Sequence, residues 1–307
     1  MGQRFTRTPF FMRKQAGGMF AMVDEVKFPG DIVFVQYTNG TDGAGYGRNP
    51  DAPVKTLDYA VGLCTANEVS TIILLPGHTE TLVAATSAAV DKAGIQIIGV
   101  GRGSLIPTFT LGTLAAATIA VTAANVLIKG IKIISAVIDA TAGITASADA
   151  DGLEVDDCWF TDGGAALELV IGVLLAAACD NVYIHDNQFH TVAGGGCASA
   201  ISFAGASDKS RIINNYIAGD YSVAGIDGAT AAGTKMLIVD NVVDNLDAAA
   251  GLAIGLNAGT TGALRGNITH GGKDGTSPIA AAGCVVGENY GSNAEGASGL
   301  IKPAVDA

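Results

Sequence analysis

The sequence has little charge and few aromatic residues. Charged residues make up 15% and aromatic residues 6% of the 307 positions, and Trp159 is the only tryptophan. Carbohydrate clefts commonly stack sugar rings on exposed aromatic side chains. The low number of aromatic residues therefore argues against a long sugar-binding groove. The net charge of −12 argues against nucleic acid as a partner of the body of the protein.

The sequence also lacks the spacings of common chemical sites. Its five cysteines (Cys64, Cys158, Cys179, Cys197 and Cys284) form no C-x-x-C pair, which argues against a zinc site and a disulfide framework. We expect buried thiols in a protein folded in a reducing cytoplasm. No nucleotide, hydrolase or zincin motif occurs, so no cofactor and no metal are predicted.

Long apolar runs are missing as well. The N-terminus has no apolar core of a signal peptide, and the longest apolar run, residues 170–179, is too short to span a bilayer. We therefore expect neither a signal peptide nor a membrane-embedded segment.

Short apolar segments bounded by turn residues fill the chain instead. Hydrophobic residues make up 49%, glycine occurs 42 times, and the segments alternate with a period of two, which favours many short strands. Nine apolar anchors recur between Leu74 and Val286 at a mean step of about 26.5 residues: Leu74, Ile98, Ile128, Val155, Ile184, Ile212, Ile238, Leu264 and Val286. Two or three strands in each such repeat describe a parallel β-helix.

This pattern predicts an all-β, right-handed parallel β-helix of about nine coils over residues 41–307. This range includes a capping helix near residues 51–66, with Asp51 as its N-cap and Val54, Leu57, Val61 and Cys64 on the face that plugs the first coil. Residues 1–40 are predicted to form an N-terminal arm.

An asparagine follows the anchor by three residues in the later coils. Asn187, Asn215, Asn241, Asn267 and Asn289 occupy this position. Asparagine tolerates the left-handed conformation that a tight corner needs, and amides stacked in register can bond to one another. We expect a structural asparagine ladder that begins near the fifth coil.

Acidic residues recur one position before the ladder, and they offer a possible catalytic or calcium-binding column. Asp157 and Asp186 would lie on adjacent coils, at a separation that suits a calcium pair or paired carboxylates. The alternative is that Asp and Asn are simply favoured at a corner. We favour the corner, because Arg265, several coils away, is the only basic residue that the sequence places close to the column. We therefore predict no catalytic residues.

The histidines and one glycine-rich segment also receive structural interpretations. His185 and His190 flank one strand without a second ligand at a metal-binding spacing, and His78 lies in a turn after a strand. The "GVGRGS" segment (99–104) is not followed by a helix, so it is interpreted as a coil corner and not as a phosphate site.

Residues 42–109 resemble a known family. "GTDGAGYGRNPDAPVKTLDYAV" and "STIILLPGHTETL" look like the first segment of pectate-lyase-like right-handed β-helix proteins, and "GIQIIGVGRGSLIPTFT" resembles phage-encoded members associated with virion genes. The resemblance implies a structural protein of a tailed bacteriophage virion, a capsid decoration or cement protein or a short head fibre, located on the capsid surface.

The resemblance also implies a homotrimer, since phage β-helix proteins of this kind are usually trimeric. The expected partners are the major capsid protein and other virion proteins. The N-terminal arm carries a net charge of +3 over residues 1–27, so Arg4, Arg7, Arg13 and Lys14 are expected to dock on an acidic shell. Two alternatives remain open: a tailspike-type polysaccharide depolymerase or glycan-binding receptor protein that meets a host-surface glycan, and a cell-surface adhesin repeat.

Overall fold

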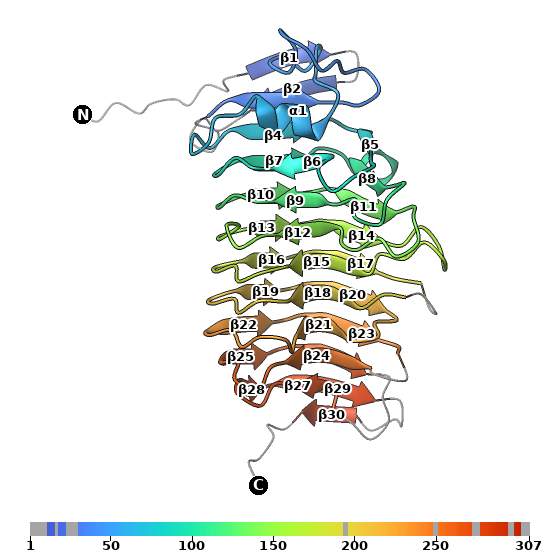
Figure 1. Ribbon diagram of the computed structural model, residues 1–307, viewed down its shortest axis with the longest axis vertical. Helices are drawn as coiled ribbons and strands as arrows, with labels where there is room; N and C mark the ends of the chain where they lie inside the picture. The colour runs from blue at the N-terminus through green and yellow to red at the C-terminus, as the bar shows by residue number, and fades with distance from the viewer. Residues whose placement is uncertain are drawn as a thin grey trace, which may run out of the picture.

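The strands of this chain follow one another in coils that stack along a rod. The computed structural model describes residues 11–15, 18–22, 30–192, 196–247, 251–271, 277–293 and 298–301. Over these residues the chain forms a right-handed parallel β-helix, which confirms the predicted fold class. Figure 1 shows the first coils at one end of the rod and the last coils at the other.

Sheet 1 has ten strands, all parallel. They are β3 (Ile32–Val35), β4 (Thr71–Leu74), β7 (Gln96–Gly99), β10 (Leu127–Lys129), β13 (Glu154–Asp156), β16 (Tyr183–His185), β19 (Arg211–Ile213), β22 (Met236–Val239), β25 (Gly262–Arg265) and β28 (Val285–Gly287). Each strand pairs with the strand one coil away, at a spacing of about 4.8 Å.

Sheet 2 also has ten strands. They are β5 (Thr79–Leu82), β8 (Thr108–Leu111), β11 (Lys132–Ser135), β14 (Trp159–Thr161), β17 (Gln188–His190), β20 (Tyr216–Gly219), β23 (Val242–Asn245), β26 (Ile268–Gly271), β29 (Asn289–Asn293) and β30 (Ser298–Ile301). The last of these, β30, runs antiparallel to β29 and covers the edge of the sheet at the C-terminal end.

Sheet 3 has eight strands and completes each coil. They are β6 (Ala88–Val90), β9 (Ile119–Val121), β12 (Ile144–Ala146), β15 (Ile171–Leu175), β18 (Ser199–Phe203), β21 (Ala224–Gly228), β24 (Leu252–Leu256) and β27 (Ile279–Ala280). The described residues therefore form eight coils with all three strands, and β28 and β29 begin a ninth. The predicted count of about nine differs slightly, because within the described residues the last coil has no third strand.

The core fills the space between the three sheets. Apolar anchors occupy equivalent positions on neighbouring strands, as in the register of Ile128 with Val155 and of Val155 with Ile184, and all three are fully buried. The Phe160 and Phe189 rings stack with centroids 4.5 Å apart. Across the core, Gly172 leaves room for them: a Cβ atom there would lie 2.7 Å from the Phe189 ring.

A short helix covers the first coil, although it begins later than predicted. Helix α1 (Leu57–Gly62) has Thr56 as its N-cap, and the Thr56 hydroxyl accepts a bond from the Tyr59 N–H. Asp51 does not cap it, because Val54 forms a parallel bridge with Val35 and holds this segment extended. The four residues of the predicted plugging face are nevertheless all buried, namely Val54, Leu57, Val61 and Cys64.

The β-helix begins inside the predicted arm of residues 1–40. Strand β3 pairs in parallel with β4, in a register that places Val33 beside Ile72 and Val35 beside Leu74 in the core. Further towards the N-terminus, β1 (Phe11–Gln15) and β2 (Gly18–Met22) form an antiparallel hairpin. None of the helices within the described residues has the length and apolar character that a membrane crossing requires.

Candidate functional site

The asparagines three residues after the anchors form a continuous hydrogen-bonded ladder. From Asn187 to Asn289, the Nδ2 atom of each amide donates to the Oδ1 atom of the next, at distances of 2.8–3.0 Å. The same Oδ1 atom also accepts the backbone N–H of the previous ladder residue, at 3.0–3.1 Å. All five side chains are buried: Asn187, Asn215, Asn241, Asn267 and Asn289.

The left-handed corner lies one residue before the ladder. The ladder asparagines point into the core, whereas positive φ angles of 50–67° occur at the preceding positions Asp157, Asp186, Asn214, Asp240, Gly266 and Glu288. The sequence-based assignment of the left-handed conformation to the ladder residue was therefore wrong by one position. The acidic column is a column of corners, where Asp and Asn are favoured for their backbone conformation.

A cluster of ionisable side chains on the outer face of sheet 1 was missed by the sequence reasoning. The register aligns Lys129 on β10 with Asp156 on β13, and Asp156 with His185 on β16. His185 lies at the centre: its Nδ1 atom is 2.6 Å from Asp186 Oδ2, and its Nε2 atom is 3.1 Å from Glu154 Oε1. We call these five residues the His185 cluster.

Basic partners neutralise the carboxylates of this cluster. Lys129 forms an ion pair with Asp156, and this hydrogen bond raises the pKa of Lys129. The prediction that Arg265 is the only basic residue near the acidic column was therefore wrong, because Lys129 comes from a coil two repeats before His185. The Arg211 guanidinium lies 4.3 Å from the centroid of the Tyr183 ring, which stacks on His185.

The environment of His185 favours its protonated form. Burial lowers the pKa of His185, but hydrogen bonds to Asp186 and Glu154 outweigh burial, so that the pKa lies above its ordinary value. The hydrogen bond to His185 in turn holds the pKa of Asp186 below its ordinary value. An imidazolium that joins carboxylates of two coils acts as an electrostatic bridge between them.

The bridge predicts a pH-dependent contribution to stability. Because the folded-state pKa of His185 is raised, its contribution is complete below the unfolded-state pKa of about 6.5 and is lost as pH rises through the higher folded-state pKa. The wild type should therefore melt roughly 1–4 °C above His185→Gln at pH 6 and lose this advantage at pH 9. Thermal unfolding of both proteins across this range, with His190→Gln as an exposed control, tests the bridge. An advantage that is the same at both pH values would contradict it.

The donor set of the cluster includes three potential metal ligands. Single ligand atoms of Glu154, Asp156 and His185 all lie within 4.8 Å of one another. The Asp156 carboxylate already forms an ion pair with the Lys129 ammonium, and the Nδ1 atom of His185 already faces the Asp186 carboxylate. The arrangement can exchange protons at His185, but within it the carboxylates serve as partners of cations that the protein itself supplies.

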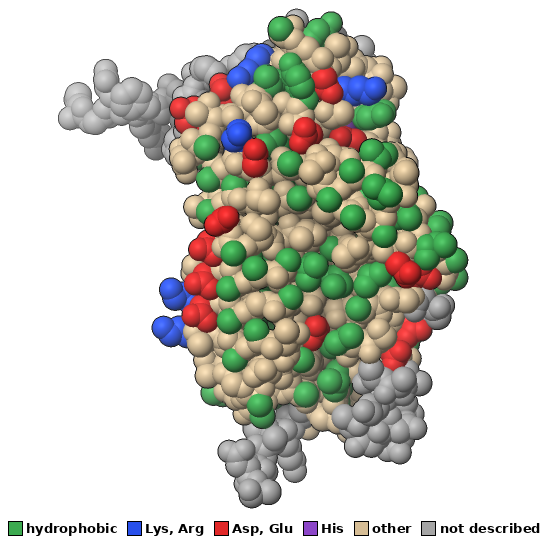
Figure 2. All heavy atoms as spheres, in the orientation of Figure 1, with side chains coloured by type: hydrophobic (Ala, Val, Ile, Leu, Met, Phe, Trp, Pro, Cys, Tyr) green, Lys and Arg blue, Asp and Glu red, His purple; other side chains and the backbone are tan. Residues whose placement is uncertain are grey.

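A second ladder of side chains runs along the edge where the chain passes from sheet 3 to sheet 1. The Asp151 carboxylate accepts the Asp180 N–H at 2.7 Å, Asp180 accepts the Asp208 N–H at 2.9 Å, and Asp208 accepts the Thr234 N–H at 2.8 Å. Figure 2 shows acidic side chains gathered along this long edge of the rod. We call Asp151, Asp180 and Asp208 the aspartate edge.

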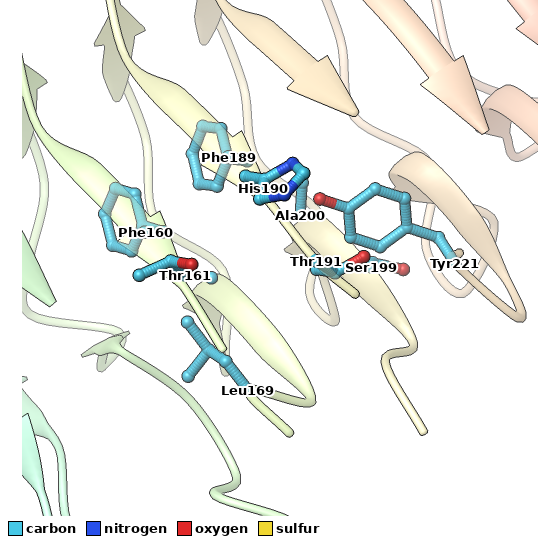
Figure 3. Close-up of a pocket in the computed structure, with 10 residues that line it drawn as sticks. Phe160, Thr161, Leu169, Phe189, His190, Thr191, Ser199, Ala200 and Tyr221 are labelled. Carbon is cyan, nitrogen blue, oxygen red and sulfur yellow. The ribbon is translucent and has the colours of Figure 1, made fainter. Parts of the chain in front are cut away.

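A small cavity lies inside the rod near the stacked phenylalanines. Its volume is about 10 Å³, room for about one water molecule, and its lining includes Phe160, Phe189, Ser199 and Tyr221. Figure 3 shows the two phenylalanine rings side by side on neighbouring strands. Burial raises the pKa of Tyr221 far above its ordinary range. This space is too small for a substrate.

His78 and the cysteines have structural surroundings. The fully buried His78 accepts the Tyr37 N–H at Nδ1, and its Nε2 atom lies 3.3 Å from Glu80 Oε2. All five cysteines are free, and four of them are buried. Burial raises the pKa of Cys158 and of Cys197 to about 12, which makes these thiols poor nucleophiles.

The residues proposed for docking are not placed by this structure. Arg4 and Arg7 lie outside the described residues, and Arg13 and Lys14 belong to β1, of whose side chains nothing is described. Their role stays a proposal.

No family model and no curated protein sequence matches the chain. Among solved structures, it is similar to pectate lyase Pel9A, at 15% identity and a TM-score of 0.46, over 84% of this chain and 80% of that one. It is also similar to a GH136 lacto-N-biosidase from Eubacterium ramulus, at 10% identity and a TM-score of 0.35, over 84% of this chain and 67% of that one. Both likenesses are too distant to transfer the role of any residue.

Proposed function

We propose that this protein is a non-catalytic structural β-helix of a tailed-phage virion, a capsid decoration or cement protein or a short head fibre. The observation that carries the proposal is that its carboxylates form hydrogen bonds and ion pairs that connect neighbouring coils. The aspartate edge accepts backbone N–H groups of successive coils, and Asp156 and Asp186 pair with Lys129 and His185. Such use of carboxylates suits a scaffold, whereas a catalytic pair needs groups that are free to act on a substrate.

The phage assignment rests on the resemblance of residues 42–109, and the docking mode rests on charge. Residues 1–27 carry a net charge of +3. Since the whole chain has a net charge of −12, the remaining residues carry −15. In this proposal, Arg4, Arg7, Arg13 and Lys14 bind the major capsid protein or a neighbouring virion protein, and the protein is a homotrimer. Contacts of this kind weaken as salt screens them.

Deletion of residues 1–29 tests the docking mode. The truncated protein should keep its fold, because β3 and the capping helix lie beyond the deletion, and it should bind virions at least tenfold more weakly than the full chain. Circular dichroism reports the fold, and co-sedimentation with virions stripped of this protein reports the binding. Full occupancy by the truncated protein would contradict the docking role of the arm.

A second candidate function is a glycan-cleaving or glycan-binding protein of the tail. The His185 cluster favours it, because an imidazole held between carboxylates can transfer protons, although the His185 side chain is only 11% exposed. Our proposal predicts no release of oligosaccharides from host capsule, lipopolysaccharide or polygalacturonate, with or without calcium. Product formation that Asp186→Asn or His185→Gln abolishes would replace the structural role with the enzymatic one.

A further inference from the structure

The residue that directly follows each ladder asparagine, or Cys158 at the equivalent position one coil earlier, points outward from sheet 2. These residues are in register on six successive strands, from β14 to β29, and we call them the outer row: Trp159, Gln188, Tyr216, Val242, Ile268 and Tyr290. The row runs along the rod for about 24 Å, since successive coils lie about 4.8 Å apart.

The outer row exposes much apolar surface. Trp159 is 38% exposed, Tyr216 54%, Ile268 57% and Tyr290 56%, and Leu300 of β30, paired opposite Tyr290, is 55% exposed. Since a large aromatic side chain has up to about 250 Å² to cover, the five together present roughly 600 Å². That area reaches the upper end of the largest patch on a typical monomer and approaches the roughly 800 Å² per partner of a standard interface.

The row is one residue wide and uncharged. The next outward positions along the same strands are polar or small: Thr161, His190, Ala218, Asp244, His270 and Ser292. Three of these, His190, Asp244 and His270, are ionisable. At its N-terminal end the row meets Lys132, whose ammonium lies 4.3 Å from the centroid of the Trp159 ring. The apolar surface is therefore a narrow stripe with ionisable groups along both sides. On the other side lie the exposed corner residues Asp157, Asp186, Asp240 and Glu288.

We propose that the outer row lies on the threefold axis of a parallel homotrimer, so that the occupant of this face is two further copies of the chain. This inference rests on the homotrimer of the proposed function, and it identifies the surface through which the three chains would contact one another. A symmetry axis brings identical residues together, so charged residues there would repel, and the row has none between Trp159 and Tyr290.

The width of the stripe favours three copies over two. Three narrow stripes can meet along a line, whereas two sheets packed face to face would also bury His190, Asp244 and His270, at a cost for each ionisable group. Gln188 suits the axis because its amide both donates and accepts, so three copies can bond to one another.

The position of the aspartate edge is compatible with this arrangement. Each coil runs from sheet 1 to sheet 2 to sheet 3, so the edge between sheet 3 and sheet 1 lies opposite sheet 2. That edge carries Asp151, Asp180 and Asp208. With the outer row at the axis, the aspartate edges of the three copies face away from one another, which limits repulsion between these edges.

Trp159 makes the interface directly observable, because it is the only tryptophan of the chain. Light scattering coupled to size exclusion should give the mass of a trimer, and acrylamide should quench Trp159 poorly in the trimer and well after dilution to monomer. Ile268→Asp places three carboxylates at the axis and should weaken assembly at least ~100-fold, the equivalent of about 2.8 kcal/mol. Val285→Asp, at a 74% exposed position on β28 of sheet 1, should leave assembly unchanged.

Circular dichroism checks that each variant is folded, and Tyr216→Asp replaces Ile268→Asp if the latter unfolds. A trimer that survives both substitutions, with Trp159 open to acrylamide, would reject this interface and leave the homotrimer standing. A wild type that is monomeric at all concentrations would reject both. A monomer whose Trp159 emission shifts on addition of host polysaccharide would assign the row to a glycan instead.

Discussion

Asn215→Ala is expected to lower the free energy of unfolding by about 3–5 kcal/mol. The Asn215 amide is buried in the middle of the ladder, accepts from both nitrogens of Asn187, and donates to Asn241 Oδ1 and to the Ile184 carbonyl. Alanine removes these bonds and leaves buried partners unsatisfied, and each such partner costs about 1–3 kcal/mol. Urea denaturation followed by circular dichroism measures the loss.

The neighbouring Asn214 provides the control. It lies at the left-handed corner with a φ of 55° and is not part of the ladder, and glycine adopts this conformation without strain. Asn214→Gly should therefore cost only about 1 kcal/mol, since it loses one exposed side-chain hydrogen bond, to Asp186, and otherwise mainly loosens the unfolded chain. Equal losses for the two variants would show that the corner, and not the ladder, holds the coils together.

Phe189→Ala is expected to cost about 3–5 kcal/mol of unfolding free energy. Phe189 is 1% exposed and stacks on Phe160, and Gly172 across the core makes room for its ring. Its removal would open a void next to a cavity that already exists, and the stacked strands limit how far the coil can close over it.

The exposed His190, one residue along the same strand, is the matched control, and His190→Ala should change stability by no more than about 0.5 kcal/mol. A loss below about 1.5 kcal/mol for Phe189→Ala would mean that the coil collapses around the missing ring.

The repeat of the sequence predicts the fold because each coil obeys the same local rule. An apolar anchor followed three residues later by asparagine is enough to place a strand of sheet 1, a corner and a strand of sheet 2. The start of the capping helix was misplaced because Asp51 and Pro53 form a good N-terminal signal, yet the bridge between Val54 and Val35 outweighs it. A bridge between segments so far apart in the sequence leaves no local signature.

The His185 cluster was missed for a related reason. Its members come from successive coils, and no single segment contains a recognisable spacing. A signal was nevertheless present: Lys129, Asp156 and His185 each directly follow an anchor, so an alignment of that position would have placed them in one line. The outer row follows each ladder position in the same way. What no alignment supplies is the pairing of charges, which depends on how the side chains turn on the surface.

The terminal strand β30 has a consequence for the length of the molecule. Every internal coil offers its neighbours the same two surfaces, so duplication of one unit of about 26 residues would lengthen the rod by about 4.8 Å without repacking the rest. The antiparallel β30 ends this repetition at sheet 2, because it presents no parallel partner in register to a further coil. Duplication of a gene segment that encodes one coil can therefore lengthen the rod in equal steps, provided that each new coil is inserted before β30.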